Sequence, residues 1–318
     1  MSRLFQALSG LKGERRSMDL VTPLAVAPPA VVPPTPKHEA KTEYYSLQVV
    51  PPTVGSVGVF PPGPVHKTEE LNEPAPKPTE AVKGPELLVS PSPESRLVAL
   101  TDPNSLGAEK FRALVTRFDH IRSQRQLKVF QVTSSVTNEG KTLVAGNVAV
   151  TLAKYSGSKT LLIEGDLHRP TLADLFGLSG LPGISQWWSG QNQQLNQFVH
   201  RLNDIPLWFL SAGKPSDRPS DLLQSARFQK AFVQLASQFD WVVVDSTPML
   251  PIVDVNLWSR LVHGTLLVVR EGVTPIEALK KGLKALDHPK LIGVVINEAS
   301  GSDQVNYDGQ YYGVRKPA

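Results

Sequence analysis

The chain has 318 residues, no cysteine and a formal net charge of +4. The lack of cysteine excludes disulfides, thiol nucleophiles and cysteine-ligated metal sites, and no apolar run reaches the roughly 20 residues that span a membrane. Both observations lead us to expect a cytoplasmic protein. Basic residues are scattered rather than gathered in a stripe, so we expect no nucleic-acid partner.

Prolines are concentrated in the first part of the chain. Of the 28 prolines, 17 precede residue 96, with charges of both signs between them. Such a segment lacks the apolar periodicity that buries a core, so residues 1–95 are predicted to be a disordered, proline-rich segment. Residues 96–300 are then expected to form one folded domain, followed by a flexible tail at residues 301–318.

Farther along the chain, short apolar runs alternate with helical patterns. A first helix is predicted at residues 109–121, because its apolar side chains share one face. Strands that are apolar throughout are predicted at residues 127–133, 159–163, 207–210, 241–244, 265–269 and 291–296. Helices are predicted at residues 141–155, 172–188, 222–239, 253–261 and 275–286. This alternation predicts an α/β fold with a mostly parallel sheet and helices on both faces, in which ligands bind at the carboxyl ends of the strands.

The loop after the first predicted strand ends in Gly140-Lys141-Thr142. Between a strand and a helix, this triplet is typical of a P-loop: the glycine admits backbone N–H groups to phosphate oxygens, the lysine reaches the β and γ phosphates, and the threonine hydroxyl ligates Mg²⁺. Asparagine tolerates a left-handed backbone, so Asn138 also fits, although the strict pattern has glycine in place of Ser135. The predicted nucleotide-binding residues of this loop are Ser135, Asn138, Glu139, Gly140, Lys141 and Thr142.

Two later strands end in acidic residues. Asp245 follows the strand at residues 241–244, which is the usual place of a Walker B acid, while Glu164 and Asp166 follow the strand at residues 159–163. A lone aspartate is often a helix cap. Two acidic strand ends beside a P-loop instead predict a magnesium–nucleotide site of the P-loop NTPase type, with Thr142, Asp166 and Asp245 near the metal.

The ordered motifs resemble the bacterial tyrosine kinases of capsule and exopolysaccharide synthesis, from about residue 109 to the C-terminus. The segments that carry the resemblance are Glu109–Arg112, Thr133–Thr142, Leu161–Pro170, Gly213 with Pro219–Ser225, Val242–Pro248 and Gly293–Asn297. Together they are far more specific than any one of them. The resemblance therefore implies an ATP-dependent protein-tyrosine autokinase that uses Mg²⁺.

The resemblance also implies roles for single residues. Lys141 and Thr142 would hold the phosphates and the metal, and Asp166 and Asp245 would support Mg²⁺. Glu164 is a candidate to accept the tyrosine proton, because a carboxylate beside the attacking phenol completes the catalytic set.

The last part of the chain supplies the remaining candidates. Asn297, which ends the last matching segment, is expected to contact the nucleotide. Three of the six tyrosines, Tyr307, Tyr311 and Tyr312, lie in the last dozen residues, whereas tyrosine rings usually pack in a core. The family phosphorylates such a cluster between neighbouring subunits, so these tyrosines are the expected phosphoacceptors; an inert tail is the alternative.

Further implications of the resemblance concern assembly. It implies a homo-oligomer and a separate activator, a membrane polysaccharide chain-length regulator that recruits the kinase to the inner face of the membrane. Two other functions stay open. A switch ATPase of the partition type shares the fold but carries an extra lysine where Val136 stands. A nucleotide-binding adaptor without catalysis is favoured by Glu164, where the family usually has aspartate, and by Val115, where its leading helix usually has a second arginine.

Overall fold

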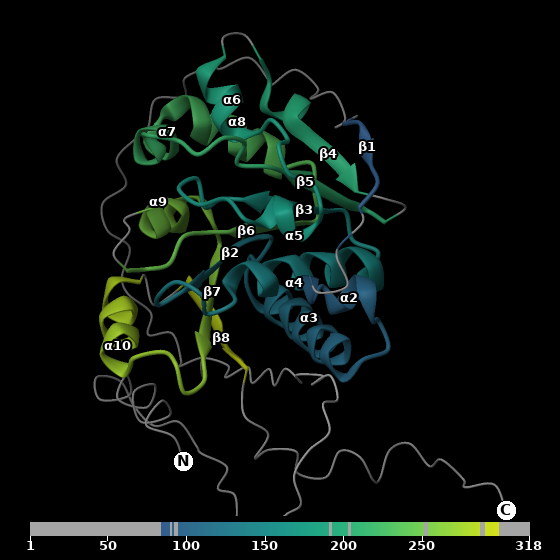
Figure 1. The fold of residues 1–318 in the computed structure, drawn as a ribbon, viewed down its shortest axis with the longest axis vertical. Helices are drawn as coiled ribbons and strands as arrows, with labels where there is room; N and C mark the ends of the chain where they lie inside the picture. The colour runs from purple at the N-terminus through teal and green to yellow at the C-terminus, as the bar shows by residue number, and fades with distance from the viewer. Residues whose placement is uncertain are drawn as a thin grey trace, which may run out of the picture.

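The computed structural model describes residues 84–89, 91, 95–190, 193–202, 205–250, 254–286 and 290–298. Most of the predicted disordered segment and the whole predicted tail at residues 301–318 lie outside these ranges. Within them, Figure 1 shows one sheet with helices packed against both of its faces.

Eight strands form this sheet in the described ranges, in the spatial order β1-β4-β5-β3-β6-β2-β7-β8. Their bounds are β1 Glu86–Leu87, β2 Val129–Ser134, β3 Thr160–Glu164, β4 Val199–Leu202, β5 Leu207–Leu210, β6 Trp241–Asp245, β7 Gly264–Arg270 and β8 Leu291–Asn297. All neighbours pair in parallel except β4 and β5, which are antiparallel. The predicted α/β fold with a mostly parallel sheet is confirmed, and each of the six predicted strands is present.

Two strands were not predicted, and both lie near one end of the sheet. β4 has the sequence Val-His-Arg-Leu and exposes Arg201, so its apolar pattern is too broken to stand out. β1 has only two residues and pairs with β4. It lies before the predicted domain boundary at residue 96, so part of the proline-rich segment contributes an edge strand to the sheet.

The helices form two layers. Their bounds are α2 Val98–Thr101, α3 Leu106–Gln124, α4 Lys141–Ser156, α5 Leu172–Leu175, α6 Ile184–Ser189, α7 Pro219–Gln224, α8 Ala226–Ala236, α9 Asp254–Leu261 and α10 Ile276–Ala285, with a 3₁₀ helix, η3, at Leu195–Phe198. Helices α2 to α5 contribute to one apolar cluster, whereas α6 to α9 contribute to a second and α9 and α10 to a third. In Figure 1, α3 and α4 lie on the opposite side of the sheet from α9 and α10.

Three predicted helices differ from those observed, and for two of them a capping serine is the reason. The predicted helix at residues 222–239 is interrupted at Ser225, whose Oγ accepts a hydrogen bond from Phe228 N at 3.1 Å and so begins α8. The region at residues 172–188 forms two short helices separated by a loop. Helix α3 begins earlier than predicted because Ser105 caps it, accepting a hydrogen bond from Ala108 N.

The alternation of side chains in the central strands explains the two layers. In β6, Trp241 and Val243 face the cluster that contains α3 and α4, while Val242 and Val244 face the cluster that contains α8 and α9. Successive side chains of a strand point to opposite faces, so a strand that is apolar throughout is covered on both sides. Val115 of α3 also lies buried in the first cluster.

Candidate functional site

The P-loop joins β2 to α4 as the sequence predicts. Asn138 has φ 64° and Gly140 has φ 92°, so both adopt the left-handed backbone. A Cβ at residue 140 would lie 2.2 Å from Asn297 Nδ2, so this position requires glycine. Lys141 follows as the first residue of α4. The first backbone N–H groups of a helix have no hydrogen-bond acceptor within the helix, so they are available to bind phosphate oxygens.

Glu139 connects the P-loop to the turn after β7 and to β8 through hydrogen bonds. Its Oε2 accepts a hydrogen bond from Val136 N at 2.8 Å, and its Oε1 accepts one from Thr274 Oγ1 in the turn after β7. The backbone carbonyl of Glu139 accepts a third bond from Asn297 Nδ2 at 3.0 Å. Burial raises the pKa of the Glu139 carboxyl, although the hydrogen bonds from Thr274 and Val136 to this carboxyl oppose the rise. Glu139 and Asn297, both predicted to bind nucleotide, therefore brace the loop in this structure.

Lys141 contacts two of the other predicted catalytic residues, Asp166 and Asp245. Its Nζ lies 3.2 Å from Asp166 Oδ2 and 3.5 Å from Asp245 Oδ1. It also lies 3.3 Å from Thr142 Oγ1. The three charged residues are largely buried, with 9% of Lys141, 6% of Asp166 and 1% of Asp245 exposed. The P-loop and the ends of β3 and β6 thus converge on one point, as predicted.

Burial and charge act in opposite directions on this cluster. Burial by itself would lower the pKa of Lys141, but Asp245 and Asp166 outweigh it, so the pKa of the lysine is raised. Burial raises the pKa of Asp245 to about 6, and the nearby Lys141 opposes that rise without cancelling it. The two shifts have the same direction because desolvation, rather than attraction to the lysine, dominates at the fully buried carboxylate.

The arrangement leaves polar atoms that a ligand can satisfy. Asp245 Oδ2, Ser135 Oγ and Thr247 Oγ1 are buried without a hydrogen-bond partner. Asp245 ends β6, Thr247 follows that strand, and Ser135 lies at the start of the P-loop after β2. No group of three His, Asp or Glu side chains suited to a metal occurs in the described ranges. Mg²⁺ is usually held by one or two carboxylates together with substrate phosphates and water, and Asp166 and Asp245 supply two carboxylates beside Lys141.

Glu164 lies in a different environment from Asp166 and Asp245. It pairs with Asp245 across β3 and β6, yet no hydrogen bond or ion pair joins it to Lys141 in the described structure. Its carboxylate is directed instead to the start of α5 and to the segment after β5, where it accepts four hydrogen bonds. The predicted tyrosine acceptors, Tyr307, Tyr311 and Tyr312, lie outside the described residues.

Two site residues escaped prediction. Thr274 bonds to Glu139 across a separation of 135 residues, and no local pattern marks it. Asp254, the first residue of α9, is buried, accepts a hydrogen bond from Ser220 Oγ at 2.8 Å and lies 3.0 Å from His168 Nε2. It links the segment after Asp166 to α7 and α9. In a sequence, an acid at the start of a helix indicates a helix cap, so the contacts of Asp254 with Ser220 and His168 could not be predicted.

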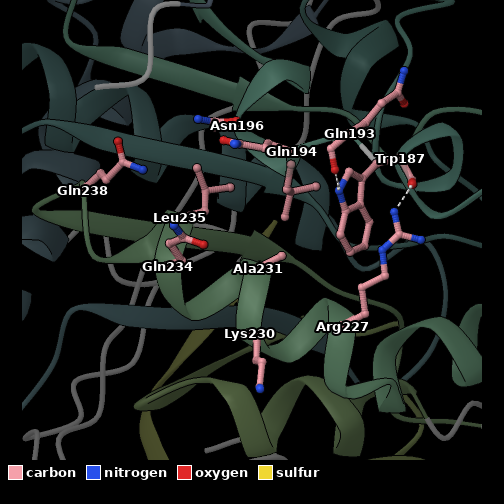
Figure 2. Close-up of a pocket in the computed structure, with 11 residues that line it drawn as sticks. Trp187, Gln193, Gln194, Asn196, Arg227, Lys230, Ala231, Gln234, Leu235 and Gln238 are labelled. Carbon is pink, nitrogen blue, oxygen red and sulfur yellow. Dashed lines mark hydrogen bonds between the residues drawn. The ribbon is translucent and has the colours of Figure 1, made fainter. Parts of the chain in front are cut away.

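A cavity is lined by residues other than those of the P-loop site. The cavity has a volume of about 330 Å³ and is lined by residues of α6, η3 and α8 and of the segments before η3 and after α8, none of them a predicted site residue. Figure 2 shows Trp187 and Arg227 side by side at one end of it. Arg227 stacks 4.4 Å from the ring of Trp187 and donates hydrogen bonds to the carbonyls of Trp187, Trp188 and Gly190. Arg227 thus serves to end α6.

Comparisons with known proteins agree with this geometry. The chain is 30% identical to the tyrosine-protein kinase YwqD of Bacillus subtilis over 224 residues, which cover 70% of this chain and 93% of that protein. It is 28% identical to the tyrosine-protein kinase CpsD of Streptococcus agalactiae over 210 residues, or 65% of this chain and 90% of that protein.

Solved structures agree as well. The crystal structure of the chimerical protein CapA2B2 is similar with a TM-score of 0.59 and 26% identity, covering 67% of this chain and 92% of that one. No protein-family model matches the chain, and no helix in the described ranges is both long and apolar enough to cross a membrane. A P-loop, two acidic strand ends and these relatives lead to one conclusion: the chain belongs to the bacterial protein-tyrosine kinases of capsule and exopolysaccharide synthesis.

Proposed function

We propose that this kinase transfers the γ-phosphoryl group of ATP to Tyr307, Tyr311 and Tyr312 of a neighbouring copy, and thereby regulates the synthesis or export of a capsular or exopolysaccharide. The observation that carries the proposal is the position of Lys141 Nζ, 3.2 Å from Asp166 Oδ2 and 3.5 Å from Asp245 Oδ1 at the start of α4. A lysine buried between two carboxylates at a phosphate loop is suited to Mg-ATP.

Each residue has a task in this reaction. Backbone N–H groups of the P-loop and the start of α4 bind the β and γ phosphates, and Lys141 turns from the carboxylates toward the same oxygens. Thr142, Asp166 and Asp245 would hold Mg²⁺, which neutralises charge on the phosphate oxygens during transfer. The tyrosine oxygen then forms its bond to the γ phosphorus as the bond from that phosphorus to ADP breaks, and the phenol proton is released to water. The catalytic contribution of the protein is chiefly position and charge.

The activity depends on assembly in this proposal. The acceptor tyrosines reach the site of a second copy, so the active form is a homo-oligomer. A membrane polysaccharide chain-length regulator acts as the activator and recruits the kinase to the inner face of the membrane. The resemblance set out above supports both steps.

The test is a phosphorylation assay on the full chain. Purified protein is incubated with Mg-ATP, with and without the cytoplasmic tail of a candidate activator, and phosphotyrosine is mapped by mass spectrometry. Lys141→Met is the matched inactive control. Label on Tyr307, Tyr311 or Tyr312 that is absent in the control supports the proposal.

Two results count against it. Phosphate release without tyrosine label would instead indicate a switch ATPase, and binding of nucleotide with neither activity, even with the activator tail, would indicate an adaptor. Mixing Lys141→Met chains with a tail-deleted kinase tests transfer between copies, since label on the inactive chain can arise only from another molecule.

A further inference from the structure

The carboxylate of Glu164 is surrounded by hydrogen-bond donors. Oε1 accepts from Leu172 N at 2.7 Å and from Ala173 N at 3.0 Å, in the first turn of α5. Oε2 accepts from Ser211 Oγ and from Ala212 N, both at 3.0 Å, in the segment that follows β5. Glu164 therefore ties two segments that are 8 and 47 residues distant from it in the chain.

These four bonds use the full capacity of the group. An ionised carboxylate has two oxygens with about four lone-pair positions, and here each oxygen accepts two bonds. Only 1% of Glu164 is exposed. A tyrosine phenol that gave its proton to this carboxylate would first have to displace a donor and reach a buried atom, and the displaced N–H group would lose its partner.

The segment that Glu164 closes carries Asp166. The bonds to Leu172 and Ala173 join the end of β3 to the start of α5, so residues 165–171 form a loop tied at both ends. Within it, Arg169 N donates to Asp166 Oδ1 at 3.0 Å, which orients the carboxylate. Two further bonds hold the loop, from Trp258 Nε1 to Gly165 O at 3.1 Å and from Ser216 N to Leu167 O at 3.0 Å.

We propose that Glu164 is a positioning residue, whose carboxylate fixes the loop of residues 165–171 and so sets Asp166 for Mg²⁺, and that it does not accept the tyrosine proton. The inference rests on the proposed function, in which Asp166 is a metal ligand. Groups that orient a metal ligand usually change metal affinity by about 10- to 100-fold when they are mutated. A glutamate suits this task, since its extra methylene lets one carboxylate meet donors on both sides.

The test compares Glu164→Gln, Glu164→Asp and Ser211→Ala with the wild-type chain. Binding of fluorescent ADP is measured while the Mg²⁺ concentration is raised, which needs no phosphoryl transfer. We expect Glu164→Gln and Glu164→Asp to raise the Mg²⁺ concentration for half-maximal binding by about tenfold or more. Ser211→Ala, which leaves the carboxylate in place but removes one donor, should raise it about threefold. Ser189→Ala, on the surface of α6, is the matched control and should not change it.

The two roles of Glu164 give opposite results. If Glu164 accepted the proton, Glu164→Gln would lose tyrosine phosphorylation at saturating Mg²⁺ with an unchanged Mg²⁺ curve, Glu164→Asp would keep activity, and Ser211→Ala would be neutral; that pattern would overturn the inference. Should Glu164→Gln fail to fold, Ser211→Ala alone decides, because it retains the charge. A wild-type chain that binds Mg-ADP but labels no tyrosine would refute the proposed function while leaving the Mg²⁺ curves to judge Glu164.

Discussion

Lys141 Nζ lies 3.2 Å from Asp166 Oδ2, so the two side chains form a buried ion pair. The same Nζ lies 3.5 Å from Asp245 Oδ1, so one lysine is shared by two buried acids and offsets only one of their two negative charges. In the proposed reaction, Asp166 and Asp245 would hold Mg²⁺, and Lys141 would then be available to contact the phosphates. Lys141 is thus the cation that both buried carboxylates contact, and this leads to the first prediction.

Replacing Lys141 by methionine leaves Asp166 and Asp245 buried without their cation. Breaking a buried ion pair from one side costs about 3–5 kcal/mol, so we expect a large loss of unfolding free energy in urea with EDTA at pH 7.5. Tyrosine phosphorylation should fall by about 10²- to 10³-fold or more. Lys284→Met, on the exposed face of α10, is the control; equal stability of the two variants would contradict the arrangement described here.

Gly140 and Gly157 flank α4 and offer a matched pair. Both have a left-handed backbone, but a Cβ at Gly140 meets Asn297 Nδ2 at 2.2 Å, whereas a Cβ at Gly157 meets nothing within 4 Å. Alanine should cost about 1–2 kcal/mol at either position through backbone strain. Gly140→Ala should cost at least about 1 kcal/mol more, since it also displaces the bond from Asn297 to the P-loop. Denaturant unfolding gives the stabilities, and titration with Mg-ADP should show binding lost only in Gly140→Ala.

Asp245 makes stability depend on pH. Its folded pKa of about 6 lies above its ordinary value of 3.8, so its contribution is most favourable below about pH 4 and is lost as the pH rises through about 6. Asparagine does not titrate. The stability of Asp245→Asn relative to wild type should therefore increase from pH 4.5 to 7.5, by about 2 kcal/mol.

Urea unfolding without metal or nucleotide measures this difference. Asp217→Asn, at an exposed position after β5, should show no such increase. A constant difference between wild type and Asp245→Asn across the pH range would mean that Asp245 is not desolvated.

Thr274 should control the P-loop through its hydroxyl. In Thr274→Val the shape is kept, but Glu139 Oε1 loses a donor and Arg270 N loses its acceptor at 2.8 Å. Hydrogen bonds to charged groups contribute about 1.5–3 kcal/mol. We expect ADP affinity to fall about tenfold, with a smaller effect on the transfer rate at saturating ATP. Thr116→Val, whose hydroxyl bonds within α3 at an exposed position, should bind ADP as tightly as wild type.

Much of the fold could be predicted because the central strands are apolar on both faces. The P-loop and the acid at the end of β6 are local signals, a glycine-lysine-threonine triplet and a strand that ends in Asp245, so their positions were predictable to the residue. β4 was not, because His200 and Arg201 interrupt its pattern. The break between α7 and α8 has a visible signal in Ser225, which caps the second helix.

The environment of Glu164 could not be predicted. Its four donors include three backbone N–H groups, and every residue type except proline supplies one. Which backbone groups converge on a side chain depends on how loops at residues 165–171 and after β5 approach each other. The sequence therefore predicts that Glu164 lies at the site, but it does not predict the hydrogen-bond donors of Glu164 or the role that follows from them.

The pairing of Glu164 with Asp245 across β3 and β6 also protects the folding of the sheet. A slip of one residue in either strand turns every side chain of that strand to the other face. Such a slip would set Ile163 beside Asp245 and drive the Glu164 carboxylate into the apolar layer occupied by Phe228 and Trp258, at the cost of burying an unpaired charge. The acids that end these strands thus help to specify the register of β3 and β6, because a misaligned sheet would be unstable even without nucleotide.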